Sequence, residues 1–136
     1  MQLFRGRLID HLQLTTRDLA AARRFYAAVL GVLGIELTEM PEASAFYGDE
    51  LWVTDRGPPT GRMHYAFQAA DRATVDRFHE AGLAAGGQDN GAPGERPYHP
   101  GYYAAFLLDP DGNNVEAVYH GEAKRSADAV EISIGG

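Results

Sequence analysis

The sequence contains no cysteine among its 136 residues. Disulfide bonds, thiolate catalysis and sulfur-ligated zinc are therefore excluded. Long hydrophobic runs are also missing, because no segment approaches the roughly 20 apolar residues that a membrane-spanning helix needs. The basic N-terminus, residues 1–8, is not followed by an apolar segment of signal-peptide length. We therefore expect a cytoplasmic protein without a membrane partner.

Basic residues are few, with 12 Lys and Arg against 19 Asp and Glu, and the formal net charge is −7. No run of basic residues interrupts this acidic balance. An acidic surface repels phosphate backbones and anionic lipids, so nucleic acid is not an expected partner. The length and the 45% apolar content are typical of one globular domain.

An internal repeat is the most informative feature. Residues 11–34 align without a gap on residues 64–87, and eight of the 24 aligned positions are identical. About one or two identities would arise by chance at ordinary residue frequencies. The identical pairs are His11/His64, Asp18/Asp71, Ala20/Ala73, Arg24/Arg77, Phe25/Phe78, Ala28/Ala81, Leu30/Leu83 and Gly34/Gly87. The chain therefore consists of two related halves.

Each half begins with a strand and a helix. The apolar segments Leu8–Thr15 and Met63–Gln68 predict the two first strands. Asp18 and Asp71 follow them, and each can accept hydrogen bonds from the first N–H groups of a helix. Apolar residues at a spacing of three to four predict the helices, and glycines at the end of each repeat stop them.

Further strands follow both helices. We expect them at Ile35–Thr38, Ala43–Tyr47 and Leu51–Thr54 in the first half, and at Tyr102–Leu108 and Asn114–Tyr119 in the second. Asp109–Asn113 predicts a tight turn rather than a calcium loop, because the other oxygen ligands of such a loop are missing.

The predicted fold class is α+β, with two βαβββ modules forming a curved mixed sheet around a central pocket. The expected boundaries are residues 7–57, a linker at 58–61, residues 62–121, and a polar tail at 122–136. One extra strand is expected in the tail at Val130–Ile134.

The paired βαβββ pattern, a histidine that opens each copy and the ending DPDGNNVEAVYH resemble the vicinal oxygen chelate superfamily. That superfamily includes glyoxalase I, fosfomycin-resistance transferases, extradiol dioxygenases and bleomycin-binding proteins. The resemblance covers about residues 7–121, and it implies a homodimer that binds a small molecule. The ending DPDGN-x-x-E is fairly specific for the superfamily and is not specific for one activity.

The resemblance also implies a divalent metal site formed by His11, His64 and Glu116. Imidazole and carboxylate suit Zn(II), Mn(II), Ni(II) or Fe(II), and three ligands leave coordination positions open for substrate. The repeat supports this site independently, because His11 and His64 occupy equivalent places. Glu116 lies between Val115 and Ala117, where a buried acid is costly unless it is paired. Glu116 is also the candidate catalytic base. The alternative for His11 and His64 is a purely structural role, which histidines on strands often have.

Trp52 marks a departure from glyoxalase I, which has a fourth ligand, Glu or Gln, on the last strand of its first module. Aligning DELWVTD with NNVEAVY places Trp52 at that position. A three-ligand site therefore fits better, and Trp52 is either a wall of the pocket or a core residue.

Residues 88–103 are rich in Gly, Pro, Tyr and His and predict a loop that is either functional or a rigid surface segment. Arg96 could pair with an anionic group of a substrate. The other candidates, which could line the mouth of the pocket or donate protons, are Tyr98, His99, Tyr102 and Tyr103.

Two functions follow as hypotheses. The first is a metal-dependent enzyme, a glyoxalase-like lyase, transferase or dioxygenase, that acts on a small oxygenated substrate. The second is a metal-free binding protein of the bleomycin resistance type, which the acidic charge and the aromatic residues favour. The sequence leaves open the substrate, the metal, and whether one chain or two build the site.

Overall fold

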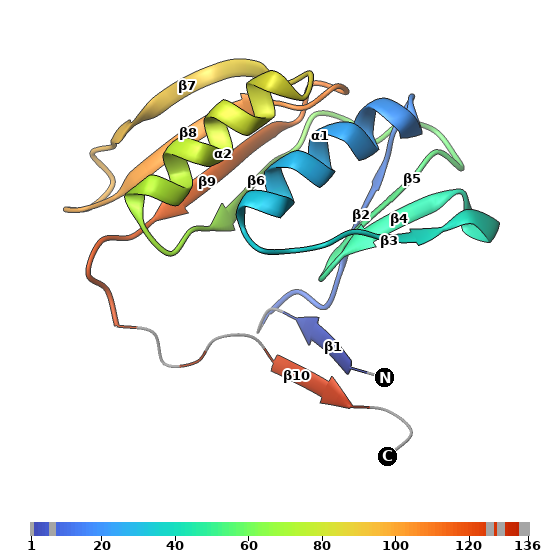
Figure 1. The fold of residues 1–136 in the computed structure, drawn as a ribbon, viewed down its shortest axis with the longest axis horizontal. Coiled ribbons are helices and arrows are strands. Elements are labelled where there is room, and N and C mark those ends of the chain that lie inside the picture. Colours follow the sequence, from blue (N-terminus) through green and yellow to red (C-terminus); the bar gives the residue numbers. More distant parts are fainter. Residues whose placement is uncertain (1, 6–7, 125–126, 128–129, 134–136) are drawn as a thin grey trace.

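The chain forms two βαβββ modules in an α+β fold, seen in a computed structural model that describes residues 2–5, 8–124, 127 and 130–133 (Figure 1). Module one contains β2 (Leu12–Thr15), α1 (Leu19–Val32), β3 (Thr38–Met40), a 3-10 turn (Pro41–Ala43), β4 (Ala45–Gly48) and β5 (Leu51–Thr54). Module two contains β6 (His64–Gln68), α2 (Arg72–Ala84), β7 (Gln88–Glu95), β8 (Tyr103–Leu108) and β9 (Asn114–Tyr119). The predicted fold class and module pattern are confirmed.

Each module has its own four-stranded mixed sheet, in the orders β2-β5-β4-β3 and β6-β9-β8-β7. The first and last strands of each module pair in parallel, and the other neighbours are antiparallel. Figure 1 shows α1 and α2 side by side, each covering one face of its own sheet. The opposite face of each sheet, which no helix covers, is called its open face below.

Alternation along the strands sends apolar side chains toward the helices. Buried residues of both modules form one hydrophobic cluster, and Phe25 and Tyr26 of α1, Phe78 of α2 and Leu107 of β8 are among its largest members. Both helices begin where the repeat predicted, because Asp18 accepts a hydrogen bond from the amide of Ala21 and Asp71 from that of Thr74.

The turn Asp109–Asn113 joins the modules. The buried carboxylate of Asp109 accepts hydrogen bonds from the hydroxyl of Tyr26 at 2.5 Å and from Nδ2 of Asn113 at 2.8 Å. It also accepts from the amides of Asp111 and Asn113. Asp111 in turn accepts from the hydroxyl of Thr16 at 2.6 Å, just before α1. The turn predicted from sequence is confirmed, and it also fixes α1 against module two.

The first strands of module one differ from their predicted bounds. β2 begins at Leu12 rather than Leu8, because residues 8–11 form a bend in which Leu8 is 94% exposed. β3 begins at Thr38 rather than Ile35, since the amide of Ile35 bonds back to the carbonyl of Leu30 at the end of α1. The chain reaches the sheet only after that helix ending.

The predicted loop at 88–103 was wrong over its first half, which is strand β7. Glycine and proline are unfavourable inside a sheet but are tolerated at an edge. β7 is the edge strand of its sheet, and its register shifts between Asp89 and Gly91 and again between Gly91 and Gly94. These irregularities accommodate the residues that suggested a loop.

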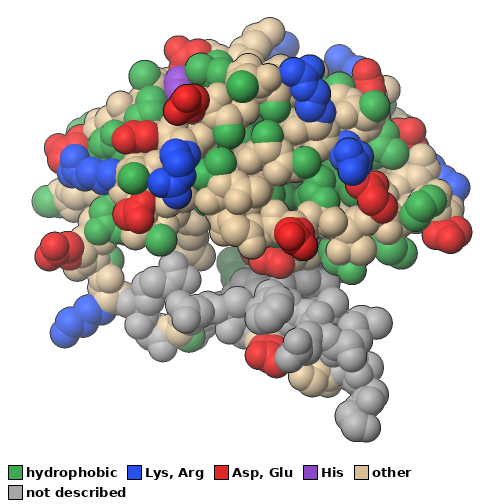
Figure 2. Space-filling model, viewed as in Figure 1, with side chains coloured by type: hydrophobic (Ala, Val, Ile, Leu, Met, Phe, Trp, Pro, Cys, Tyr) green, Lys and Arg blue, Asp and Glu red, His purple; other side chains and the backbone are tan. Residues whose placement is uncertain are grey.

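The strand predicted at Val130–Ile134 is present as β10 (Val130–Ser133), and Ile134 lies outside the described residues. β10 pairs antiparallel with β1 (Gln2–Arg5), and this ribbon lies apart from the two sheets in Figure 1. None of the helices described is long and apolar enough to cross a membrane. Figure 2 shows acidic and basic side chains interspersed over one face of the molecule.

Two helical glycines give opposite predictions for stability. A Cβ on Gly82 in α2 would collide with Leu107 and lie 3.1 Å from Cγ1 of Val29 in α1, whereas nothing lies within 4 Å of a Cβ on Gly31. Gly82→Ala should therefore destabilise the fold by about 1–3 kcal/mol through overpacking. Gly31→Ala should stabilise it by about 0.5–1 kcal/mol, since alanine favours the helix. Urea unfolding of both variants checks this, and stabilisation by Gly82→Ala would contradict the close packing of the helices.

Candidate functional site

The open face of module two carries the strongest candidate site. Strand alternation directs His64 of β6, Phe106 of β8 and Glu116 of β9 to this face, while their neighbours pack beneath α2. The register pairs Glu116 with Ala66 on one side and with Phe106 on the other. His64, two residues before Ala66, therefore lies close to Glu116.

Glu116 is a buried carboxylate with two hydrogen-bond partners. Its residue is 3% exposed, and Nε2 of His64 lies 2.9 Å from its Oε1. The hydroxyl of Tyr102, just before β8, donates to its Oε2. The side chain of His64 is 54% exposed, so the imidazole remains open to solvent on its other side. A buried acid is stabilised by such partners and would be costly without them.

Tyr102 connects this carboxylate to the tip of the β7–β8 connection. Burial of the hydroxyl and its hydrogen bond to Glu116 raise the pKa of Tyr102 above its usual range. The rings of Tyr98, His99 and His120 each lie at about a right angle to the ring of Tyr102, with centroids 4.9–5.3 Å away. Tyr98, His99 and Tyr102, three of the candidates from sequence, are therefore neighbours.

His120 lies directly after β9, next to His99 of the β7–β8 connection. Its ring stacks on that of His99 with centroids 5.1 Å apart, and its Nδ1 lies 2.8 Å from Nε2 of His99. Both imidazoles are exposed. His120 thus contacts the ring of Tyr102, which in turn donates to Glu116.

His11 is not brought to this pair within one chain. It lies before β2 in module one, exposed, with Nδ1 2.6 Å from a carboxylate oxygen of Asp10. Among residues 2–5, 8–124, 127 and 130–133, no three His, Asp or Glu side chains form a group that could hold a metal ion. The structure brings together His64 and Glu116, and the three-ligand site stays a prediction.

Trp52 occupies the place in module one that Glu116 occupies in module two. Trp52 pairs in register with Gln13, as Glu116 pairs with Ala66, and Gln13 and Ala66 are equivalent in the repeat. The ring of Trp52 stacks on that of Tyr47, with centroids 5.7 Å apart and planes 7° from parallel. Trp52 is half-buried on the open face of module one, so an aromatic pair replaces a carboxylate there.

Tyr103 lies on the opposite side of the sheet from the other candidates. Its hydroxyl donates to Asp76 of α2 at 2.7 Å, and the guanidinium of Arg72 lies 4.7 Å from its ring centroid. The hydrogen bond to Asp76 raises the pKa of Tyr103. Tyr103 therefore anchors α2 to β8, and the open face receives Tyr102 instead.

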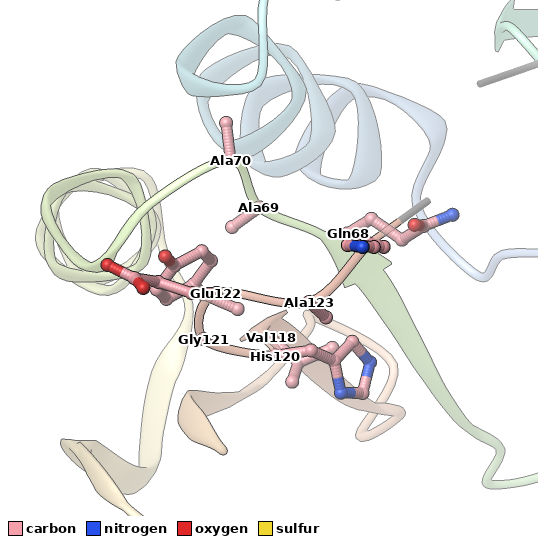
Figure 3. Close-up of a pocket in the computed structure, with 10 residues that line it drawn as sticks. Gln68, Ala69, Ala70, Val118, His120, Gly121, Glu122 and Ala123 are labelled. Carbon is pink, nitrogen blue, oxygen red and sulfur yellow. The ribbon is translucent and has the colours of Figure 1, made fainter. Parts of the chain in front are cut away.

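A hollow of about 680 Å³ lies elsewhere in module two, beyond the ends of β6 and β9 (Figure 3). Residues 68–70 and 118–124 line it, and Figure 3 shows His120 at its margin. His64 and Glu116 do not line it. Its polar lining residues are Gln68, Tyr119, His120, Glu122 and Lys124. The sequence contained no signal for this hollow, which depends on how two connections pass each other.

The comparisons with known proteins agree with the fold. The sequence profile of the Glyoxalase/Bleomycin resistance protein/Dioxygenase superfamily matches residues 8–117. No curated protein matches the sequence. The chain belongs to this superfamily, whose members include enzymes and binding proteins.

Several solved structures are similar to this chain. A glyoxalase/bleomycin resistance protein from Albidiferax ferrireducens T118 shares 30% identity, with a TM-score of 0.69 over 82% of this chain and 97% of that one. A glyoxalase-related enzyme from Fulvimarina pelagi shares 21%, with a TM-score of 0.68 over 95% and 99%. Lactoylglutathione lyase from Agrobacterium tumefaciens shares 24%, with a TM-score of 0.61 over 83% and 93%. The last two likenesses concern the fold.

The raised pKa of Tyr102 predicts a loss of stability in alkali. The folded chain holds this proton more tightly than the unfolded chain, so the stabilisation is complete below about pH 10 and is lost as the pH rises toward the raised pKa. Tyr102→Phe should therefore lose less stability than the wild type between about pH 9 and 11 in urea unfolding. Equal slopes for Tyr102→Phe and the wild type would contradict the prediction.

Proposed function

We propose that the open face of module two is half of a metal-dependent active site for a small oxygenated substrate, and that module one of a second copy completes it. The observation that carries the proposal is the buried carboxylate of Glu116, with the nitrogen of His64 2.9 Å from one oxygen. An imidazole that is 54% exposed and a buried carboxylate thus place two electron-pair donor atoms side by side.

The donor set fits a divalent ion. His64 and Glu116 would supply two ligands, and His11 of a second copy would supply the third. Nitrogen and carboxylate ligands suit Zn(II), Mn(II), Ni(II) or Fe(II), and a three-ligand site keeps positions open for substrate. When bound, such an ion supplies Lewis-acid stabilisation to oxygens of the substrate. His11 is exposed, and the contact with Asp10 involves only its Nδ1. This arrangement is compatible with a metal ligand that is contributed to the site of a second chain.

The chain's own residues would hold and move protons at this site. Tyr102 keeps its proton on the hydroxyl and donates it in a hydrogen bond to Oε2 of Glu116, which fixes the orientation of the carboxylate. Oε1 faces His64 and is the atom of Glu116 that can act as a general base. Phe106, with its ring 6.0 Å from that of His64, excludes water from one side.

A metal-free binding protein is the second candidate, and the stacked Tyr47 and Trp52 rings favour it. They form a flat aromatic surface at the position where a fourth ligand stands in glyoxalase I. Stacking on such rings binds planar or cationic molecules without a metal. A purified protein that binds no metal would favour this binding function over the metal-dependent enzyme.

Metal content separates the two candidates. We expect wild-type protein purified without chelator to bind about one divalent ion per chain, and His64→Ala and Glu116→Gln to bind at least about 10-fold more weakly, because each loses a ligand. His79→Ala is the matched control, since His79 belongs to α2, on the side of the sheet opposite the open face, and its Nε2 lies 2.9 Å from Oδ1 of Asp89. Elemental analysis and titration with Zn(II) or Mn(II) measure this. Wild-type protein that stays metal-free after supplementation would leave the binding protein as the better candidate.

A mixing experiment tests whether two chains share the site. His11→Ala and Glu116→Gln, each refolded alone, should bind metal at least about 10-fold more weakly than the wild type. After the two variants are unfolded and refolded together, mixed dimers should contain one intact site, and binding should return to roughly a quarter of all sites. A site built by one chain would show no recovery, and this result would refute the shared arrangement.

A further inference from the structure

Arg96 presents a positive charge on the same open face, at the end of β7. Its amide donates to the carbonyl of Tyr102 at 2.9 Å, which extends the β7–β8 ladder by one residue. Its side chain folds back along β7, where Nη2 donates to the carbonyl of Ala92 at 2.8 Å and Nη1 to that of Glu95 at 3.3 Å. The guanidinium is therefore held in place by the backbone of its own strand.

Two glycines make room for this guanidinium. A Cβ on Gly91 would lie 3.3 Å from Nη2 of Arg96 and 3.0 Å from Cδ1 of Phe106. A Cβ on Gly94 would lie 3.1 Å from Nη1 of Arg96. Glycine weakens a strand, so two of them here are explained by the close approach of the Arg96 side chain.

Phe106 links Arg96 to the candidate site. The carbon of the guanidinium lies 5.3 Å from the ring centroid of Phe106, a favourable cation–π distance. The same ring lies 6.0 Å from that of His64, and Phe106 is the register partner of Glu116. β7 and β9 flank β8, so the strand from which Arg96 extends lies roughly 10 Å from the strand of Glu116.

The charge of Arg96 is not balanced by a carboxylate in residues 8–124. The neighbouring Glu95 turns to the other side of the sheet and pairs with Arg72 of α2 at 2.6 Å, and Arg96 itself forms no ion pair with any residue described there. Arginine stays protonated at all ordinary pH values. Three of its five N–H donors remain after the two carbonyl contacts, which is enough for a two-pronged contact with an oxyanion.

We infer that Arg96 binds the anionic group of the substrate, a carboxylate or a phosphonate, while the remainder of the molecule lies over Phe106 toward His64 and Glu116. This inference deepens the proposed function, since it assigns the substrate class to the same face. It rests on the proposed function only for the placement of the substrate, because the oxyanion contact needs no metal. The substrate is thus a small organic acid rather than a neutral or cationic molecule.

The test uses the full-length chain treated with EDTA, and the probes are benzoate, phenylphosphonate and the neutral benzamide. In ¹⁵N-labelled protein, the Nε–H signal of Arg96, assigned by its loss in Arg96→Lys, should shift saturably with benzoate or phenylphosphonate and not with benzamide. Dissociation constants on the order of 1 mM are expected for so few contacts. The relative strength of the two anions distinguishes a planar from a tetrahedral group.

Two arginine variants form a matched pair. Arg96→Gln should weaken binding of the anion about 10-fold or more, whereas Arg72→Gln, on the helix side of the sheet, should change it less than about 2-fold. Unchanged binding by Arg96→Gln, an equal effect of Arg72→Gln, an equal response to benzamide, or no saturable shift of the wild-type signal would each overturn the inference.

The outcome is separable from that of the metal proposal. His64→Ala should lose the metal and still bind benzoate or phenylphosphonate in EDTA, because His64 makes no contact with the guanidinium. Arg96→Gln should keep its metal affinity. If metal binds and the anion does not, only the role of Arg96 is overturned. If the anion binds and metal does not, only the metal site is overturned.

Discussion

The hydrogen bonds to the buried carboxylate of Asp109 are the interaction on which the rest of the structure depends. The carboxylate accepts hydrogen bonds from two backbone amides of its own turn, from the side-chain amide of Asn113 and from the hydroxyl of Tyr26 in the other module. Burial, together with the neighbouring Tyr65 hydroxyl and the Asp109 carboxylate, raises the pKa of Tyr26, so the donor keeps its proton. An acid without these donors would be costly at this depth, and the donors without the acid would be left unsatisfied.

This interaction also determines where the candidate site lies. β9 begins directly after the turn, and Glu116 is three residues beyond Asn113. The amide of Met63 bonds to the side chain of Asn113, and the amide of Asn114 to the carbonyl of Met63, so the start of β6 is fixed against the same turn. His64 and Glu116 therefore meet because one turn positions both strands. The turn that joins the modules and the pair on the open face are parts of one arrangement.

The sequence predicted the features that depend on local spacing and on the repeat. The helix caps at Asp18 and Asp71 and the bounds of β9 follow from neighbouring residues, and all are confirmed. β7 was missed because glycine and proline suggest a loop, whereas an edge strand with shifted register tolerates them. The repeat also implied that Trp52 replaces Glu116 in module one, and the strand register agrees.

Side-chain relations between distant segments were harder to predict. Strand alternation alone could have separated Tyr102 from Tyr103, had the start of β8 been known to one residue. The hydrogen bond from Tyr102 to Glu116 needed the β8–β9 register as well. The distance between His11 and Glu116 depends on how the modules pack, and a repeat shows only that their places are equivalent. The guanidinium of Arg96 lies over Phe106 because two glycines lack side chains, a relation that no single-residue pattern contains.

The pairing of β1 with β10 has a consequence for the topology of the chain. Gln2 is the register partner of Ser133, so these two residues lie about 5 Å apart between their Cα atoms. A short connection across that ribbon, with the chain opened at residues 58–61, would give a circular permutant in which the second half precedes the first. In this permutant the ribosome would synthesise module two before module one, and the same contacts between the two modules would form.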